Sequence, residues 1–204
     1  MQDEVMQDLS ILIDKGGYVM IPLLILSVIS VTLILERCWF WLLVGGRGSI
    51  GYLEKLNALL RRGEFDKATE MVKRDKSPYG FVAKALLSEG TSDAVAMEAV
   101  ESQRPRIDRF MVALSTIITA APLLGILGTV LGIIQSFRLL GEQSVLTDPS
   151  DVAGGIAAAL LTTALGLIVA LITLFPYMLF RGWSSRSISR LESVIAAAQQ
   201  GGEE

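Results

Sequence analysis

The chain contains 204 residues, 51% of them hydrophobic, and its 18 Lys and Arg against 21 Asp and Glu give a net charge of −3. Charges of both signs share the polar segments, so the sequence provides no single-sign basic surface for nucleic acid. It has no histidine and one cysteine, Cys38. This excludes imidazole metal sites, histidine proton relays, a disulfide framework and a CxxC metal motif, and we expect no cofactor.

Residues 1–17 carry an amphipathic pattern. Val5, Leu9 and Leu12 recur at helical spacing against the acidic residues Asp3, Glu4 and Asp8. This pattern favours a short helix lying on the outer membrane surface, and a disordered terminus is the alternative.

Three segments are apolar and long enough to cross a bilayer, which takes about 20 helical residues for about 30 Å of hydrocarbon. They lie within residues 18–44, which include the inner interface, and within 109–140 and 152–180. The second and third exceed the required length, so we expect them to project beyond the lipid. The predicted fold is an all-α integral membrane protein with three transmembrane helices and long helices that extend into a cytoplasmic helical domain.

The positions of Lys and Arg predict the orientation, because these residues accumulate on the cytoplasmic side. Twelve of the 18 lie between Arg47 and Arg109, and three more follow the last span, whereas the loop 141–151 has none. We therefore expect the N-terminus and the loop 141–151 on the outer side of the membrane and the C-terminus in the cytoplasm.

The cytoplasmic region 45–108 shows helical patterns separated by glycine and proline. The expected helices cover residues 52–62, 64–74 and 81–88, and a further one starts at Asp93. Because only Pro105 interrupts the last pattern, we expect that helix to continue through Arg109 into the second span, with a bend at the proline.

No segment resembles an enzyme site. Carboxylates such as Glu64 and Glu70 stand beside Lys67 and Lys73 at helix-pairing distance, which is typical of a solvated helix face. No nucleophile, base and orienting group occur together, and no GxxxxGK motif is present. We predict that the protein is not an enzyme.

The second span carries small and polar residues at heptad-like spacing, so they form a stripe on one helix face. The stripe consists of Ser115, Thr119, Pro122, Gly125, Thr129, Gly132 and Ser136. Gly128 and Gly132 add a small-xxx-small motif, which permits close helix approach. The other face carries large apolar residues suited to lipid.

The third span repeats this design with Gly155, Ala159, Thr163, Gly166, Ala170 and Thr173. For the glycines we favour helix packing alone. For Thr129, Thr162 and Thr163 two readings stay open, namely packing and an ion pathway, because threonine can also bond its own backbone. Residues 110–137 and 152–180 contain no ionisable group apart from one tyrosine, so any ion that crosses here needs a titratable group from another polypeptide.

Glu36 and Arg37 end the first span beside two tryptophans and are interpreted as an anchor at the inner interface. In the final segment, residues 181–204, the apolar residues again recur at helical spacing, which predicts an amphipathic helix packed on the cytoplasmic region. These residues are Ile188, Leu191, Ile195 and Ala198.

Three blocks of this sequence resemble the MotA/TolQ/ExbB proton-channel family, and more closely its three-span ExbB and TolQ branch than the four-span MotA. They are GGYVMIPLLILSVISVTLILER (Gly16 to Arg37), APLLGILGTVLGIIQSF (Ala121 to Phe137) and ALLTTALGLIVA (Ala159 to Ala170). The second block is the most specific of the three.

The resemblance implies a homo-pentamer in the bacterial inner membrane whose second and third helices line a pore around two single-span partners of the ExbD or TolR type. Each partner supplies an intramembrane aspartate, which Thr129 and Thr163 would face. The complex would use the proton motive force to drive outer-membrane transport or maintain envelope integrity, acting through a TonB-like or TolA-like protein.

Two positions depart from the family pattern. Ala158 stands where many relatives have a glutamate, which leaves the choice between protons and sodium ions open. Ile172 stands where relatives usually have proline, which occurs here only at Pro176. From the residues alone, a non-conducting membrane scaffold is the main alternative, and a permease subunit is disfavoured by the absence of repeats and of broken, charged spans.

Overall fold

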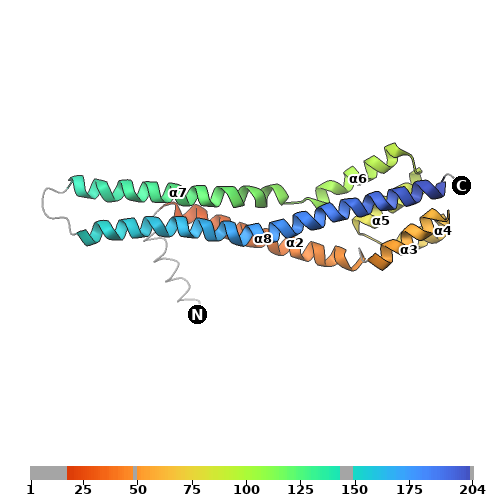
Figure 1. Ribbon diagram of the computed structural model, residues 1–204, viewed down its shortest axis with the longest axis horizontal. Helices are drawn as coiled ribbons and strands as arrows, with labels where there is room; N and C mark the ends of the chain where they lie inside the picture. The colour runs from red at the N-terminus through yellow and green to blue at the C-terminus, as the bar shows by residue number, and fades with distance from the viewer. Residues whose placement is uncertain (1–17, 48–49, 143–148, 203–204) are drawn as a thin grey trace. The chain divides into compact units, whose positions relative to one another are not determined.

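A computed structural model of the protein describes residues 18–47, 50–142 and 149–202, and within these ranges every regular element is a helix (Figure 1). The helices are α2 (Met20–Arg47), α3 (Ile50–Arg61), α4 (Phe65–Val72), α5 (Pro78–Glu89), α6 (Asp93–Ile107), α7 (Met111–Glu142) and α8 (Pro149–Gly202). The predicted all-α fold is confirmed. The surface helix expected within 1–17 and most of the loop 141–151 lie outside the described residues.

Three helical stretches among the described residues are long and apolar enough to cross a membrane. They are Met20–Gly45, Met111–Arg138 and Ala153–Gly202. The last is much longer than the roughly 20 residues that a bilayer requires, so α8 must extend beyond the hydrocarbon. The protein is therefore a multi-pass membrane protein, as the hydropathy pattern predicts.

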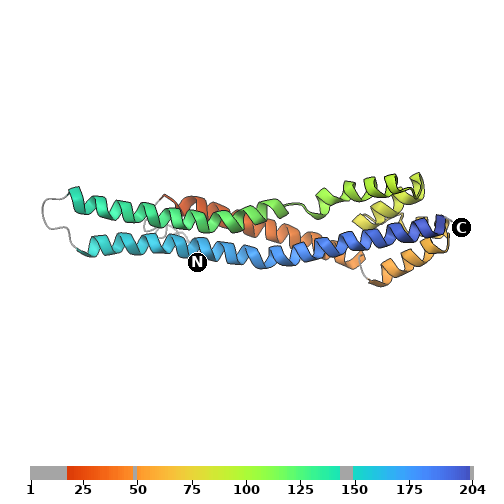
Figure 2. The same ribbon diagram turned by 45° about the horizontal axis from the view of Figure 1, so that its top comes forward.

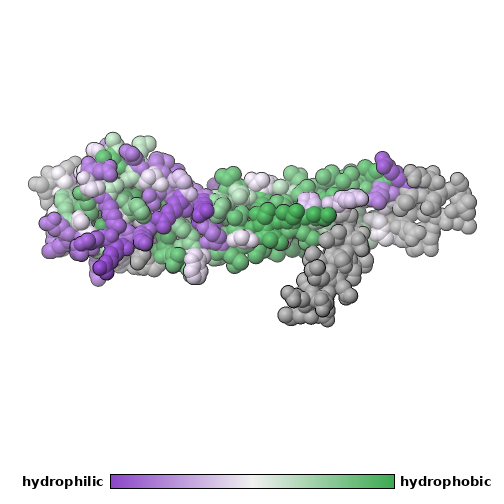
Figure 3. Space-filling view, turned by 180° about the vertical axis from the view of Figure 1, so that it is seen from behind, coloured by the Kyte–Doolittle hydropathy of each residue, from purple (hydrophilic) through white to green (hydrophobic). Residues whose placement is uncertain are grey.

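The described residues form two compact units. Unit 1 contains α2 up to Ile34, α7 from Val112 and α8 up to Tyr177. In it, α7 and α8 run antiparallel and side by side (Figures 1 and 2). A cluster of buried apolar residues in this unit consists of Val19, Leu23, Ile117, Ala121 and Val169. Most of its other large side chains are exposed, and Figure 3 shows this surface to be predominantly hydrophobic.

Unit 2 contains α2 from Leu35, helices α3 to α6, and α8 from Met178. The end of α8 is its central element, because Leu191 and Val194 are fully buried there. Hydrogen bonds tie α8 to three other helices: Tyr79 of α5 to Ser187 (2.8 Å), Asn57 of α3 to Ser193 (3.0 Å), and Asp93 of α6 to Gln199 (2.8 Å). The segment 45–108 thus completes its core with the C-terminal helix.

Local sequence signals account for the short helices of unit 2. Pro78 occupies the first turn of α5, whose N-cap Ser77 accepts a hydrogen bond from the backbone of Gly80 at 3.3 Å. Ser92 caps α6 in the same way. Gly63 between α3 and α4 has a φ of 66°, which residues with a Cβ rarely adopt, so a glycine suits this turn.

The expectation of one helix running from Asp93 into the second span is wrong. α6 ends at Ile107, and the backbone of Asp108 donates to the Arg104 carbonyl. Phe110 then adopts a φ of 63°, and α7 begins at Met111. A non-glycine residue in the left-handed region cannot continue a helix, so the helix is interrupted here, a few residues after Pro105.

Candidate functional site: the packed stripes of α7 and α8

The small residues of α7 and α8 bring the two backbones into direct contact within unit 1. A Cβ atom on Gly166 would lie 2.5 Å from the Ala121 carbonyl oxygen, and one on Gly125 would lie 2.9 Å from the Thr163 Cα. Neither position has room for a methyl group. The same crowding recurs along the contact, where Gly128 faces Thr162, Gly132 faces Ala159, and Gly155 faces Ser136.

Two threonine hydroxyls join the helices at the Gly125 carbonyl. Thr163 Oγ1 donates to it at 2.8 Å and Thr162 Oγ1 at 3.2 Å. Thr162 also donates to the carbonyl of Ala159, one turn back on α8, at 2.7 Å, and is fully buried. Interhelical hydrogen bonds of this kind stabilise membrane helix pairs by about 0.6 kcal/mol each.

Thr129 is placed differently from Thr162 and Thr163. Its hydroxyl donates at 2.7 Å to the carbonyl of Ile126 on its own helix, and its side chain is half-buried. None of the hydrogen bonds among the described residues links Thr129 to α8. The structure therefore brings Thr162 and Thr163 together at Gly125, and leaves the Thr129 hydroxyl bonded to its own helix.

The stripe predicted on α7 divides into two faces. Gly125, Gly128 and Ser136 are buried towards α8, whereas Ser115, Thr119, Pro122 and Thr129 keep exposed or half-exposed surface. A heptad repeat drifts by about 20° per seven residues around a straight helix, so the stripe turns by about 60° over its length. On α8, by contrast, Ala159, Gly166 and Ala170 are all buried, and Gly155 lies at their edge.

The contact between α7 and α8 contains no charged side chain, so its electrostatics come from the dipoles of hydroxyl and peptide groups. Residues 112–137 and 153–176 contain no Asp, Glu, Lys, Arg or His. The hydroxyls of Thr129, Thr162 and Thr163 donate to backbone carbonyls, and each oxygen retains lone pairs that can accept a hydrogen bond. Such a surface can receive a proton donor, but its own donors are already engaged.

One contact of unit 1 was not predicted. Ser30 of α2 and Thr173 of α8 share a buried hydrogen bond of 2.5 Å, which fastens α2 to α8. The signal in the sequence was a serine within an apolar span. It did not identify a partner, because several hydroxyls on the other spans satisfy the same description.

Arg37, predicted to be an interface anchor, has a specific structural role in unit 2. Its guanidinium is 1% exposed and donates to the carbonyls of Arg106 and Ile107, at 3.3 Å each. It also donates two hydrogen bonds to Glu36, at 2.6 and 3.0 Å. Arg37 thus places a positive charge at the C-terminus of α6, where unpaired carbonyls and the helix dipole favour a cation.

Comparison with known proteins assigns this architecture to a family. A sequence profile described as the MotA/TolQ/ExbB proton channel family matches residues 74–193, a range that includes α7 and the packed part of α8. The chain belongs to this family. It is a family of transport and channel proteins rather than of enzymes.

Three relatives of the chain match over most of their lengths. Putative biopolymer transport protein ExbB-like 3 from Synechocystis sp. is 34% identical over 87% of this chain and 87% of its own. ExbB-like 1 of the same organism is 34% identical over 88% of this chain and 73% of its own. Biopolymer transport protein exbB1 from Vibrio cholerae is 29% identical over 93% and 86%, respectively.

Proposed function

We propose that this chain is the ion-conducting subunit, of the ExbB or TolQ type, of an inner-membrane complex that converts the proton motive force into mechanical work on the cell envelope. Membership of the proton channel family and relatives named biopolymer transport proteins support this role. The observation that carries the proposal is the pair of packed helices that combine threonine hydroxyls with no Asp, Glu, Lys, Arg or His across the span. In this proposal the N-terminus lies in the periplasm and the C-terminus in the cytoplasm, which the distribution of Lys and Arg supports.

The second and third spans of this chain lack an acidic residue, so a partner protein would have to supply one. A conduction cycle through protons needs a group that titrates, and intramembrane carboxylates usually perform this task. We propose a dimer of single-span proteins of the ExbD or TolR type, each with one intramembrane aspartate, inside a pentamer of this chain. The partner would pass force to a TonB-like or TolA-like protein, for outer-membrane transport or envelope integrity.

The surface formed by α7 and α8, called the wall below, would interact differently with the protonated and the ionised form of such an aspartate. A protonated carboxyl can donate its O–H to the Thr129 or Thr163 oxygen, which has a free lone pair. An ionised carboxylate needs donors, and both hydroxyl protons already point at the carbonyls of Ile126 and Gly125. The neutral acid therefore rests against this wall, and loss of its proton favours movement away from it. One charge that crosses the membrane potential releases about 2.3 kcal/mol per 100 mV.

The proposal is tested by co-expression with a single-span aspartate protein of the same genome, followed by native mass spectrometry. We expect five copies of this chain with two of the partner. The complex is then reconstituted in vesicles for proton-flux measurements. Replacing Thr129 and Thr163 by valine removes both oxygens at constant shape and should abolish flux while the complex still assembles.

Thr32→Val is the matched control. Thr32 is exposed on α2 and its hydroxyl donates only to the Val28 carbonyl, at 2.8 Å, so its loss should leave flux unchanged. Normal flux in the Thr129 and Thr163 double variant would refute the hydroxyl pathway. Repeating the measurement in a sodium gradient without a proton gradient decides which ion is carried.

A non-conducting scaffold is the second candidate, and one observation favours it. The hydroxyls of Thr162 and Thr163 are engaged in joining α7 to α8, which is sufficient reason for their presence. A scaffold would form a homo-oligomer that ignores the single-span protein, and its double valine variant would show weaker assembly. The native mass spectrum and the flux assay separate the two functions.

A further inference from the structure

The break between α6 and α7 occurs where the local sequence favours a helix. Residues 106–110 contain no glycine or asparagine, which are the residues that most readily adopt a positive φ. Phe110 nevertheless has a φ of 63°, and it is the only non-glycine residue with a positive φ in the described part of the chain. Other contacts must hold this conformation, because it is less favourable than a helical one for an L residue. A disagreement between local preference and observed conformation is typical of a functional element.

Arg37 of α2 occupies the two acceptors that a continuous helix would use at this break. In an α-helix each N–H donates to the carbonyl four residues earlier, so Phe110 would donate to Arg106, and Met111 to Ile107. The Arg37 Nη1 group donates to these same two carbonyls, at 3.3 Å each. The Phe110 N–H makes no hydrogen bond among the described residues. The guanidinium and the helix therefore compete for one pair of carbonyl groups.

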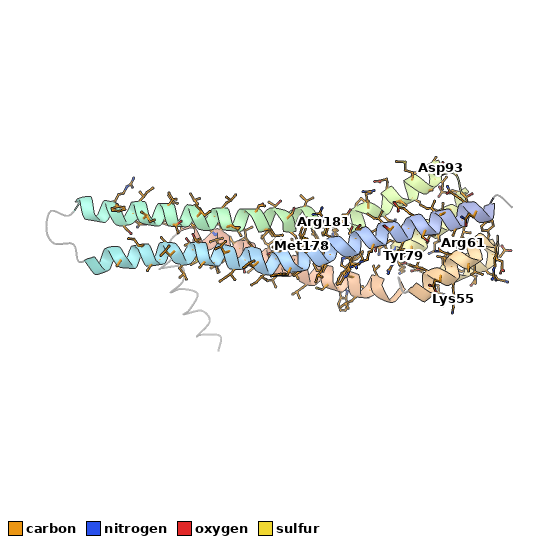
Figure 4. The ribbon with its side chains drawn as sticks, viewed as in Figure 1. Lys55, Arg61, Tyr79, Asp93, Met178 and Arg181 are labelled. Carbon is orange, nitrogen blue, oxygen red and sulfur yellow. The ribbon has the colours of Figure 1, made fainter. Side chains whose placement is uncertain are left out.

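Side chains of α2 and α8 hold the interrupted form. Glu36 accepts two hydrogen bonds from Arg37, at 2.6 and 3.0 Å, and so orients the guanidinium. Arg37 is 1% exposed, which means that its charge depends on these protein partners instead of on water. On α8, Ser184 lies one turn after the Arg181 labelled in Figure 4, and its hydroxyl donates to the Asp108 carboxylate. The break is thus contacted from two other helices.

We propose that the junction between α6 and α7 is a two-state conformational switch in which Arg37 acts as a latch. In the latched state, which is the observed one, Arg37 bonds to the carbonyls of Arg106 and Ile107, and Phe110 is left-handed. In the released state, Arg37 withdraws and the N–H groups of Phe110 and Met111 bond to those carbonyls, so that α6 and α7 join into one helix.

The latch would respond to movement of the first span. Arg37 belongs to α2, so a shift of the inner end of α2 along α6 would withdraw the guanidinium and allow the helix to close. Such a shift exchanges one set of hydrogen bonds for another, which is the property of a bistable element. The inference rests on the contacts of Arg37 and does not depend on the proposed ion pathway.

Hydrogen–deuterium exchange of the full-length protein in micelles, resolved to single amides by mass spectrometry, tests the switch. Arg37→Met removes the donors and keeps an unbranched side chain. The Phe110 amide gains a helical acceptor in the released state, so it should exchange at least about tenfold more slowly in this variant than in the natural chain. If Arg37 only capped α6, its loss would leave this exchange unchanged or make it faster, and either result would overturn the proposal.

Arg109→Met is the matched control. The Arg109 guanidinium lies 4.6 Å from the Phe110 ring centroid and 3.8 Å from a Glu36 oxygen, but it donates to neither of the two α6 carbonyls. After correction for the changed neighbour, the Phe110 amide should exchange within about twofold of its rate in the natural chain. An equal slowing in Arg109→Met and Arg37→Met would overturn the proposal, because loss of any nearby charge would then have the same effect.

Two substitutions of Phe110 test the switch while Arg37 stays in place. Glycine adopts a positive φ without strain and should keep the latched state, whereas valine, which is branched at Cβ, should favour the continuous helix. The readout is the Arg109 amide, which would bond to the Pro105 carbonyl in that helix. It should exchange at least about fivefold more slowly in Phe110→Val than in Phe110→Gly. Equal rates in the two variants would overturn the proposal.

Discussion

Replacing Gly166 with alanine tests the close contact between α7 and α8. The new Cβ would lie 2.5 Å from the Ala121 carbonyl oxygen, 3.2 Å from its carbonyl carbon and 3.3 Å from the Gly125 Cα. All three are backbone atoms, which cannot rotate aside as a side chain can. The helices must therefore separate by a substantial fraction of an ångström.

The energetic consequence follows from what that separation disrupts. Overpacking a tight interface costs about 1–3 kcal/mol. Stretching the two threonine hydrogen bonds to Gly125 adds about 1 kcal/mol at the usual 0.6 each. Alanine regains about 1 kcal/mol in helix propensity. We expect Gly166→Ala to lower the free energy of unfolding by about 1–3 kcal/mol.

Gly154 on the same helix is the matched control, because no atom lies within 4 Å of its added Cβ. Gly154→Ala should be neutral or about 1 kcal/mol more stable, since only the propensity gain applies. The measurement is unfolding in mixed micelles titrated with SDS and followed by circular dichroism, at two protein concentrations to separate folding from assembly. Equal midpoints for the two variants would refute the assigned contact.

Three further predictions use the same unfolding assay. Gly132→Phe should prevent close packing, because an added Cβ already meets Ala159 at 2.6 Å, whereas Leu127→Phe, at a position 46% exposed, should be nearly neutral; equal damage would contradict the face assignment. Arg37→Met should lower the free energy of unfolding by about 2–3 kcal/mol through loss of charged hydrogen bonds. Arg109→Met removes only an exposed 3.8 Å contact with Glu36, so it should lower that free energy by less than about 1 kcal/mol. Gly63→Ala should lower the free energy of unfolding by about 1–2 kcal/mol, because Gly63 has a positive φ. An unchanged unfolding midpoint would show that the turn between α3 and α4 relaxes.

The sequence was sufficient for the features that depend on composition and local periodicity. Three apolar segments of sufficient length predict three spans, and the recurrence of Gly125, Gly132 and Gly166 predicts close helix contact, because small residues have this effect wherever they line one face. The motifs of the second and third spans also led to the family. None of these inferences requires knowledge of which helix packs against which.

Only the tertiary structure showed which residues of different helices contact one another. Thr162 and Thr163 both bond to the Gly125 carbonyl, whereas Thr129 bonds to its own helix. The heptad spacing of the small residues does not reveal this difference, because residues at that spacing rotate gradually around α7. The tertiary structure also showed that the helix predicted to bend at Pro105 is interrupted at Phe110, and that Arg37 supplies the charge that stabilises the end of α6. Periodicity defines the face of a helix locally, but contacts between residues distant in sequence depend on how the helices pack, and only the folded chain determines them.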